Sequence, residues 1–139
     1  MKNDATTAKV VRNRVRHAAF ENIIRFKHVP FIDIGRKHVL QAAIQGEHYE
    51  VAEMYPPFIQ DAEAEGERRA LRSFSYAWEV EKTHENLYRE ALALLEEGKK
   101  EEDEYDYYVC PVCGHTHKRN APEVCPVCGA PGSRFEKVA

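Results

Sequence analysis

The 139-residue sequence lacks long apolar runs, and it has no cysteine before residue 110. A membrane-spanning helix needs about 20 consecutive apolar residues, and a secretory signal needs an apolar core near the N-terminus. Neither pattern is present, and no internal repeat is visible. We therefore expect no membrane association, no disulfide framework of the secreted type and a location in the reducing cytoplasm.

The net charge of −3 hides a strong asymmetry along the chain. Residues 1–46 carry nine Lys/Arg and three Asp/Glu, residues 47–109 carry seven and eighteen, and residues 110–139 carry four and two. The acidic middle argues against a nucleic-acid partner. We interpret the basic N-terminal positions as a solvated helix face rather than an RNA or acidic-surface site: Arg12, Arg14, Arg16, Arg25 and Lys27.

All four cysteines belong to two Cys-Pro-Val-Cys knuckles, each followed by a glycine, with eleven residues between the knuckles: Cys110, Cys113, Cys125 and Cys128. Four thiolates at this spacing form a tetrahedral cage for one metal ion, and the glycine after each knuckle permits the positive φ that turns amides toward sulfur. Iron and zinc both accept such a cage, so the spacing leaves the choice open. About thirty residues build too small a core, so this segment depends on its metal to fold.

Composition divides the chain into four segments, and the pattern is mainly α. Residues 1–37 form a basic segment with a helix over about 8–28, ended by Pro30 and Gly35. Residues 38–98 form a helical hairpin: one helix from about Lys37, kinked at Pro56 and Pro57, and another over about 67–98. Gly66 is the turn and Gly98 the end. Residues 99–106 are a charged linker, too polar to pack, and residues 107–139 are the cysteine segment.

Two pairs of polar residues lie within the apolar stripes of the hairpin. Glu47 and Glu50 are three residues apart, as are Glu81 and His84, so each pair projects from one helix face. Counted from Gly66, the pairs lie at the same level, about 25 Å from the turn at 1.5 Å per residue. Carboxylates and an imidazole gathered in a bundle suit two iron or manganese ions.

The alternative is that these groups are ordinary surface charges on Glu-rich helices. Their shared level and apolar surroundings favour the metal site, because unpaired buried charge is costly. We expect the other histidines to be surface or local polar groups: His17, His28, His38, His48, His115 and His117.

Three stretches resemble the rubrerythrin family. Residues 43–56 (AIQGEHYEVAEMYP) are similar to the third bundle helix of rubrerythrins, residues 79–84 (EVEKTH) to the fourth, and residues 107–138 to their C-terminal rubredoxin-like domain. The resemblance covers about residues 38–138. It implies a ferritin-like hairpin, half of a four-helix bundle, followed by a rubredoxin-like domain.

Rubrerythrins are non-haem iron peroxidases that reduce hydrogen peroxide at a di-iron site fed through an Fe(Cys)4 centre. The resemblance implies that Glu47, Glu50, Glu81 and His84 are di-iron ligands, that Tyr55 is an orienting hydrogen-bonding tyrosine, and that the four cysteines hold iron rather than zinc. The expected partners are hydrogen peroxide as substrate, and a redox protein or NAD(P)H-dependent reductase as electron donor.

The sequence departs from the family pattern in its first part. A full rubrerythrin has two earlier helices that carry another glutamate and another Glu-x-x-His, whereas residues 1–37 contain one glutamate, Glu21, and no Glu-x-x-His. We expect a homodimer in which two hairpins form one bundle with a symmetric di-iron site. The alternatives are a non-catalytic metal-binding or electron-carrier protein, and ferritin-like iron sequestration.

Overall fold

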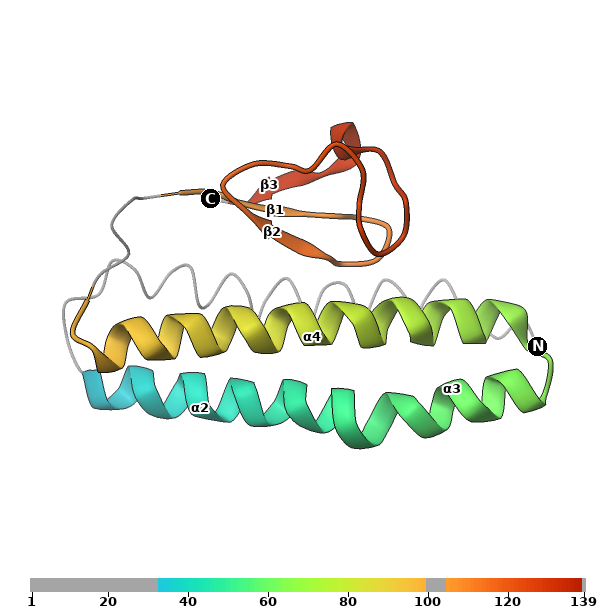
Figure 1. Cartoon of the computed structure of the whole chain (residues 1–139), viewed down its shortest axis with the longest axis horizontal. Coiled ribbons are helices and arrows are strands. Elements are labelled where there is room, and N and C mark those ends of the chain that lie inside the picture. Colours follow the sequence, from blue (N-terminus) through green and yellow to red (C-terminus); the bar gives the residue numbers. More distant parts are fainter. Residues whose placement is uncertain (1–32, 100–104, 139) are drawn as a thin grey trace, which may run out of the picture.

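The computed structural model describes residues 33–99 and 105–138, and shows a long helical hairpin with a small three-stranded module beside one arm (Figure 1). The first arm runs through α2 (Asp33–Tyr49), the π-helix η2 (Glu50–Met54) and α3 (Tyr55–Ala64). The second arm is α4 (Arg68–Glu96). None of the described helices is long and apolar enough to span a bilayer.

The start of the first arm differs from the sequence-based expectation. α2 is already helical at Asp33, the first described residue, rather than beginning at about Lys37, and Gly35 lies inside it rather than ending a preceding element. A glycine lowers helix propensity by about 1 kcal/mol, which the following turns of α2 outweigh. The helix expected over residues 8–28 lies outside the described residues.

Both helix ends predicted from glycines are confirmed. Gly66 and Gly98 adopt φ of 70° and 66°, a left-handed conformation that costs glycine little. The residue after each glycine donates its amide back into the last helical turn, Glu67 to Ala62 at 2.9 Å and Lys99 to Leu94 at 2.9 Å. These bonds satisfy carbonyls that a helix C-terminus otherwise leaves without donors.

The open end of the hairpin is held together by apolar packing. Leu40 and Ile44 of α2 are buried against Tyr88 of α4, with Leu92 and Leu95 packed around them. Full burial of one such aliphatic side chain contributes about 1.5–3 kcal/mol. This contact fixes the distance between α2 and α4 just beyond the level of the predicted carboxylate site.

The kink expected at Pro56 and Pro57 is a π-helical turn just before them. The amide of Tyr55 donates to the carbonyl of Glu50, one residue further back than in an α-helix. Val51 thereby loses its α-helical donor, and its π-helical donor would be Pro56, which has no N–H. The indole Nε1 of Trp78 on α4 donates to the Val51 oxygen instead, at 2.8 Å.

The C-terminal module is a small antiparallel sheet with two metal-type knuckles. Its strands are β1 (Tyr107–Val109), β2 (Thr116–Lys118) and β3 (Glu136–Val138), in the order β2-β1-β3, and a 3-10 turn η3 (Gly132–Arg134) precedes β3. Three-residue strands bury little apolar surface. The module therefore needs a further source of stability, and the four cysteines are placed to supply it by binding one metal ion.

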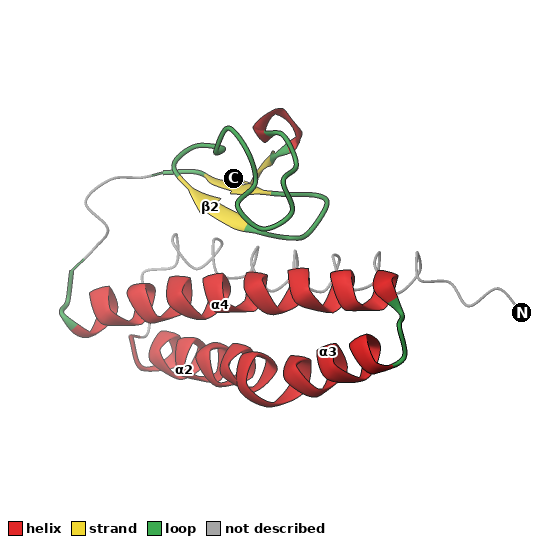
Figure 2. Ribbon diagram, turned by 45° about the vertical axis from the view of Figure 1, so that its right-hand side comes forward, coloured by secondary structure: helices red, strands yellow, loops and turns green. Residues whose placement is uncertain are grey.

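The module packs against α4 rather than standing apart from it (Figure 2). Val80 of α4 is fully buried in one cluster with Cys110, Cys113, Cys125 and Ala130. Lys118 of β2 also pairs with Glu90 of α4. The cysteine module thus lies over the middle of α4, on a face that the sequence did not distinguish.

The expectation of a non-packing linker is wrong at its C-terminal end, and residues 100–104 lie outside the described part. Asp106 pairs with Lys137 of β3 at 2.8 Å, and its carbonyl accepts the amide of Arg119. The ring of Tyr105 packs against the ring of Tyr107 at an interplanar angle of 59°, with the ring centroids 5.5 Å apart. These two residues belong to the cysteine module.

Replacing Trp78 with Phe should destabilise the hairpin by about 1–3 kcal/mol, because it removes the donor from the partly buried Val51 carbonyl. Chemical denaturation measures the loss. Since the chain has one Trp, the NMR spectrum contains a single indole N–H signal. We expect this proton to exchange slowly with solvent.

A Pro56→Ala background separates the lost hydrogen bond from the smaller ring. Alanine restores an N–H at position 56, so Trp78→Phe should cost less there than in the natural sequence. An equal cost in both backgrounds would show that the Val51 bond does not stabilise the π-helical turn.

Candidate metal centres

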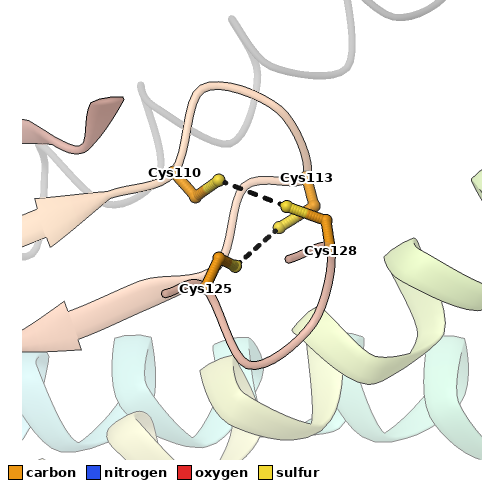
Figure 3. Close-up of side chains that lie close together, drawn as sticks. All are labelled: Cys110, Cys113, Cys125 and Cys128. Atoms are coloured by element: carbon orange, nitrogen blue, oxygen red, sulfur yellow. Dashed lines mark hydrogen bonds between the residues drawn. The ribbon is translucent and has the colours of Figure 1, made fainter. Parts of the chain in front are cut away.

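The four cysteine side chains converge from the two knuckles (Figure 3). Their sulfurs all lie within 4.8 Å of one another, and the pairs Cys110–Cys128 and Cys113–Cys125 are 3.6 Å apart. Sulfurs at 2.3 Å from one tetrahedral ion would be about 3.8 Å apart. The arrangement therefore fits a single metal ion.

The two knuckles have the same backbone geometry. The glycine amide after each knuckle donates to the carbonyl of its first cysteine, Gly114 to Cys110 at 2.8 Å and Gly129 to Cys125 at 3.0 Å. Both glycines have positive φ, 90° and 73°, as their sequence position predicted. The His115 amide also points at the Cys113 sulfur, 3.5 Å away. Amides directed at sulfur stabilise thiolate charge.

The protonation of the thiols follows from burial and these amides. Burial raises the pKa of Cys113 far above its usual range, against the opposing effect of the His115 amide. Burial likewise raises the pKa of Cys128. At Cys125 burial also opposes ionisation, but the amides of Cys128 and Val127 outweigh it and lower the pKa. A bound cation would have to displace protons from at least two thiols.

A second cluster joins the two arms of the hairpin. One ligand atom each from Glu47 of α2 and from Glu81 and His84 of α4 lie within 4.8 Å of one another. His84 Nδ1 is 2.8 Å from Glu81 Oε2 and 4.0 Å from Glu47 Oε1. Oxygen and nitrogen ligands bind a divalent ion at about 2.1 Å, so these atoms can reach the same ion.

This cluster lies in the interior. Glu81 is 1% exposed and His84 4% exposed. Tyr88, one turn after His84, is also buried, and burial followed by the negative charge of Glu47 raises the pKa of its hydroxyl. Charges so enclosed need a compensating cation or proton. The donor set of two carboxylates and one imidazole fits iron or manganese.

The structure places the other two predicted site residues apart from this cluster. Glu50 begins the π-helix η2, is partly exposed and does not join the three ligand atoms within 4.8 Å. Tyr55 begins α3, is buried, and packs near Phe74 with ring centroids 6.5 Å apart. The roles assigned to both residues stay predictions.

Sequence reasoning missed the residues that join the two centres. The sequence analysis singled out neither Val80, which contacts the cysteine cluster, nor Thr116, whose hydroxyl is 3.2 Å from His84 Nε2. His115, expected to be a surface or local polar group, is buried, and its burial and the neighbouring His117 and His84 lower its pKa to about 4. No periodicity marks these residues, because their burial comes from the docked module.

Comparison with known proteins identifies both parts of the chain. The family model described as rubrerythrin matches residues 11–92, and the model for the rubredoxin-like domain of rubrerythrin matches residues 108–136. The chain belongs to the rubrerythrin family. The first match starts upstream of the boundary expected at residue 37, and that boundary stays a prediction.

Individual relatives agree with this assignment. The chain is 38% identical to Rubrerythrin-2 of Clostridium acetobutylicum over 97 residues, and 34% identical to rubrerythrin of Nitratidesulfovibrio vulgaris over 99 residues. Each match covers 70% of this chain and 52% of the relative. A solved structure of nigerythrin in its fully reduced, all-ferrous state superposes with a TM-score of 0.66 at 32% identity, over 73% of this chain and 48% of that one.

The chain thus spans about half the length of the curated relatives it matches. Within that span it has the two features of a rubrerythrin. These are the rubredoxin-like set of four cysteines and the Glu/His cluster of the ferritin-like helices. The resemblance stated from the sequence is confirmed, and so is the mainly helical fold with a small C-terminal cysteine module.

The affinity of the cysteine site for zinc should fall steeply as the pH falls. Because burial keeps the thiols of Cys113 and Cys128 protonated in the metal-free protein, binding releases about two protons from these groups alone. The logarithm of the apparent association constant should rise with a slope of about two or more between pH 6 and 8. Competition with a chromophoric chelator measures it.

Cys128→Ser is the matched variant for this titration. Cys128 lies at the rim of the site and is one of the two thiols whose pKa is raised. Its replacement should therefore decrease the slope by about one. An affinity independent of pH would show that the thiols are already ionised without metal.

Proposed function

We propose that this protein is a rubrerythrin-type peroxide reductase that works at the Glu47, Glu81 and His84 cluster. The observation that supports it most is the position of the two centres on α4. Val80 is buried among the cysteines, and the next residue, Glu81, belongs to the carboxylate cluster. An electron-storing site and a substrate-reducing site so close together suit a two-electron reduction.

The chemistry needs two electrons and two protons for each peroxide, which yields two waters. Glu47, Glu81 and His84, with the same residues of a second chain, would hold two ferrous ions, each of which could give one electron and add positive charge that favours cleavage of the O–O bond. Glu81 and His84 are buried and Glu47 is partly buried, so these groups would keep the metal largely away from bulk water. The four cysteines would hold an iron that could return these electrons one at a time.

A second copy of the chain would complete the ligand set. Di-iron bundles use a glutamate from each of two helices and a Glu-x-x-His from each of two others. The described hairpin has one of each, namely Glu47 on α2 and Glu81 with His84 on α4. A two-fold axis along the bundle would bring the equivalent groups of the partner to the same level.

The surface of the hairpin is compatible with such a partner. Val39, Tyr49 and Phe58 expose 45%, 53% and 43% of their surface, and all three lie on the arm formed by α2, η2 and α3. Burying them between two chains removes apolar area from water. We propose a homodimer in a reducing compartment, with a redox protein or an NAD(P)H-dependent reductase as electron donor.

Replacing both Glu81 and His84 with Ala should reduce steady peroxide turnover more than about 100-fold, since a bound iron loses two ligands in each chain. Peroxide consumption with an external electron donor measures the rate. Glu79→Ala is the matched control, because Glu79 lies on the same helix but is exposed and pairs with Lys82. It should leave the rate within about twofold.

Turnover that persists in the double variant would show that the helical cluster is not where peroxide reacts. The protein would then be an electron carrier that works through its cysteine site. Iron uptake far above four ions per dimer, the number that the cysteine and helical sites would hold, would instead support iron sequestration if it occurred without turnover.

The metal content and the mass in solution should change together. With iron at both kinds of site, sedimentation should give the mass of two chains, and analysis should give two cysteine-bound and two cluster-bound irons per dimer. Glu47→Gln should weaken binding at the helical cluster while the cysteine iron, seen by its visible charge-transfer band, remains. A monomer that binds two irons in its own cluster would contradict the shared site.

A further inference from the structure

His84 makes contacts through both ring nitrogens, and its two partners belong to different parts of the fold. Nδ1 faces the carboxylates, 2.8 Å from Glu81, whereas Nε2 faces the hydroxyl of Thr116 in β2, 3.2 Å away. His84 is 4% exposed and Thr116 3% exposed, so water does not compete for these contacts. The imidazole therefore bridges the helical cluster and the cysteine module.

Thr116 continues the contact toward the cysteines. Its hydroxyl also lies 3.4 Å from the carbonyl oxygen of Gly114. That carbonyl and the amide of His115 form the same peptide group, and the His115 amide points at the Cys113 sulfur at 3.5 Å. A hydrogen bond accepted by the carbonyl of a peptide strengthens the bond that its N–H donates.

The donor and acceptor roles in this series of hydrogen bonds depend on which nitrogen of His84 carries the hydrogen. Next to an ionised Glu81, which only accepts, Nδ1 carries the hydrogen and Nε2 accepts from the Thr116 hydroxyl. A metal ion on Nδ1 requires a lone pair there, so the hydrogen moves to Nε2 and is donated to Thr116. The hydroxyl hydrogen of Thr116 is then released for the Gly114 carbonyl.

We propose that Thr116 is a positioning residue for His84 and transmits the metal loading of the helical cluster to the cysteine site. The route is a chain of hydrogen bonds and one peptide group: His84, Thr116, Gly114, His115 and Cys113. Loading the helical cluster turns the Thr116 hydroxyl toward Gly114 and strengthens the amide bond on the Cys113 sulfur. A stronger bond to sulfur favours the reduced, more negative iron site and raises its reduction potential.

The proposal has a functional consequence. An empty helical cluster leaves the cysteine iron at a lower potential, and a loaded cluster raises it. The cysteine iron would thus retain an electron more readily when a site that can use it is in place. The inference rests on metal binding at the proposed peroxide-reducing cluster, but not on peroxide chemistry.

Zinc provides a test without turnover. With one zinc per chain at the cysteines, long-range proton–nitrogen NMR should show His84 with hydrogen on Nδ1. With further zinc in the helical cluster, the hydrogen should move to Nε2, and the His115 amide proton should shift downfield. Thr116→Val, which keeps the size of the side chain, should abolish the His115 shift, and Thr116→Ser should retain it.

The reduction potential gives an independent readout. Iron is placed at the cysteines, and its midpoint potential is measured with and without zinc in the helical cluster. The natural protein and Thr116→Ser should show an upward shift, and Thr116→Val should show a clearly smaller one. Thr83→Val removes a neighbouring hydroxyl of α4 that contacts Glu79 rather than His84, and it should behave as the natural protein.

Each other outcome counts against the proposal in a recognisable way. An equal upward shift in Thr116→Val would mean that the charge of the zinc acts through space, and Thr116 would have no part in it. Zinc bound only at the cysteines would overturn this proposal and the proposed function together. If peroxide turns over but the His115 amide proton does not shift when the helical cluster is loaded, only the proposed role of Thr116 would be overturned.

Discussion

The burial of acidic and basic groups between α2 and α4 is the constraint on which the rest of this structure depends. Glu81 and His84 are almost completely enclosed, and Glu47 approaches them from the facing helix. Isolated charges at such depth would cost an amount comparable with the net stability of a small domain. They are tolerable when they share protons or a cation. The hairpin is thus organised around a polar interior, and its apolar packing of Leu40, Ile44 and Tyr88 lies to one side.

α4 is the element that both centres share. Its successive residues Val80 and Glu81 face different neighbours, the cysteine module and the carboxylate cluster. One helix turn later His84 contacts both through its two nitrogens. A rigid helix fixes the relative positions of two sites more precisely than a linker could. This arrangement explains how a charged connecting segment is compatible with a defined contact between the centres.

Several features of the fold could be predicted from local chemistry. The paired knuckles indicated one metal site, because the Cys-x-x-Cys-Gly spacing itself defines a local geometry. Gly66 and Gly98 indicated helix ends, because glycine adopts at low cost the positive φ that ends a helix. The start of α2 was expected at about Lys37, but the helix already includes Gly35 despite the low helix propensity of glycine. The π-helical turn was seen only as a proline kink, since its stabilising partner, Trp78, lies 27 residues from Val51.

The sequence by itself determined the chemical inventory: four thiols at metal spacing, and a glutamate level with a Glu-x-x-His across a glycine turn. These follow from the fixed rise of a helix and the fixed reach of a knuckle, which do not depend on distant contacts. Only the tertiary structure decided which face of α4 the cysteine module covers. That choice buries Val80 among the cysteines and brings Thr116 to His84, because docking joins surfaces far apart in the chain through shape and hydrogen bonding that no local pattern encodes.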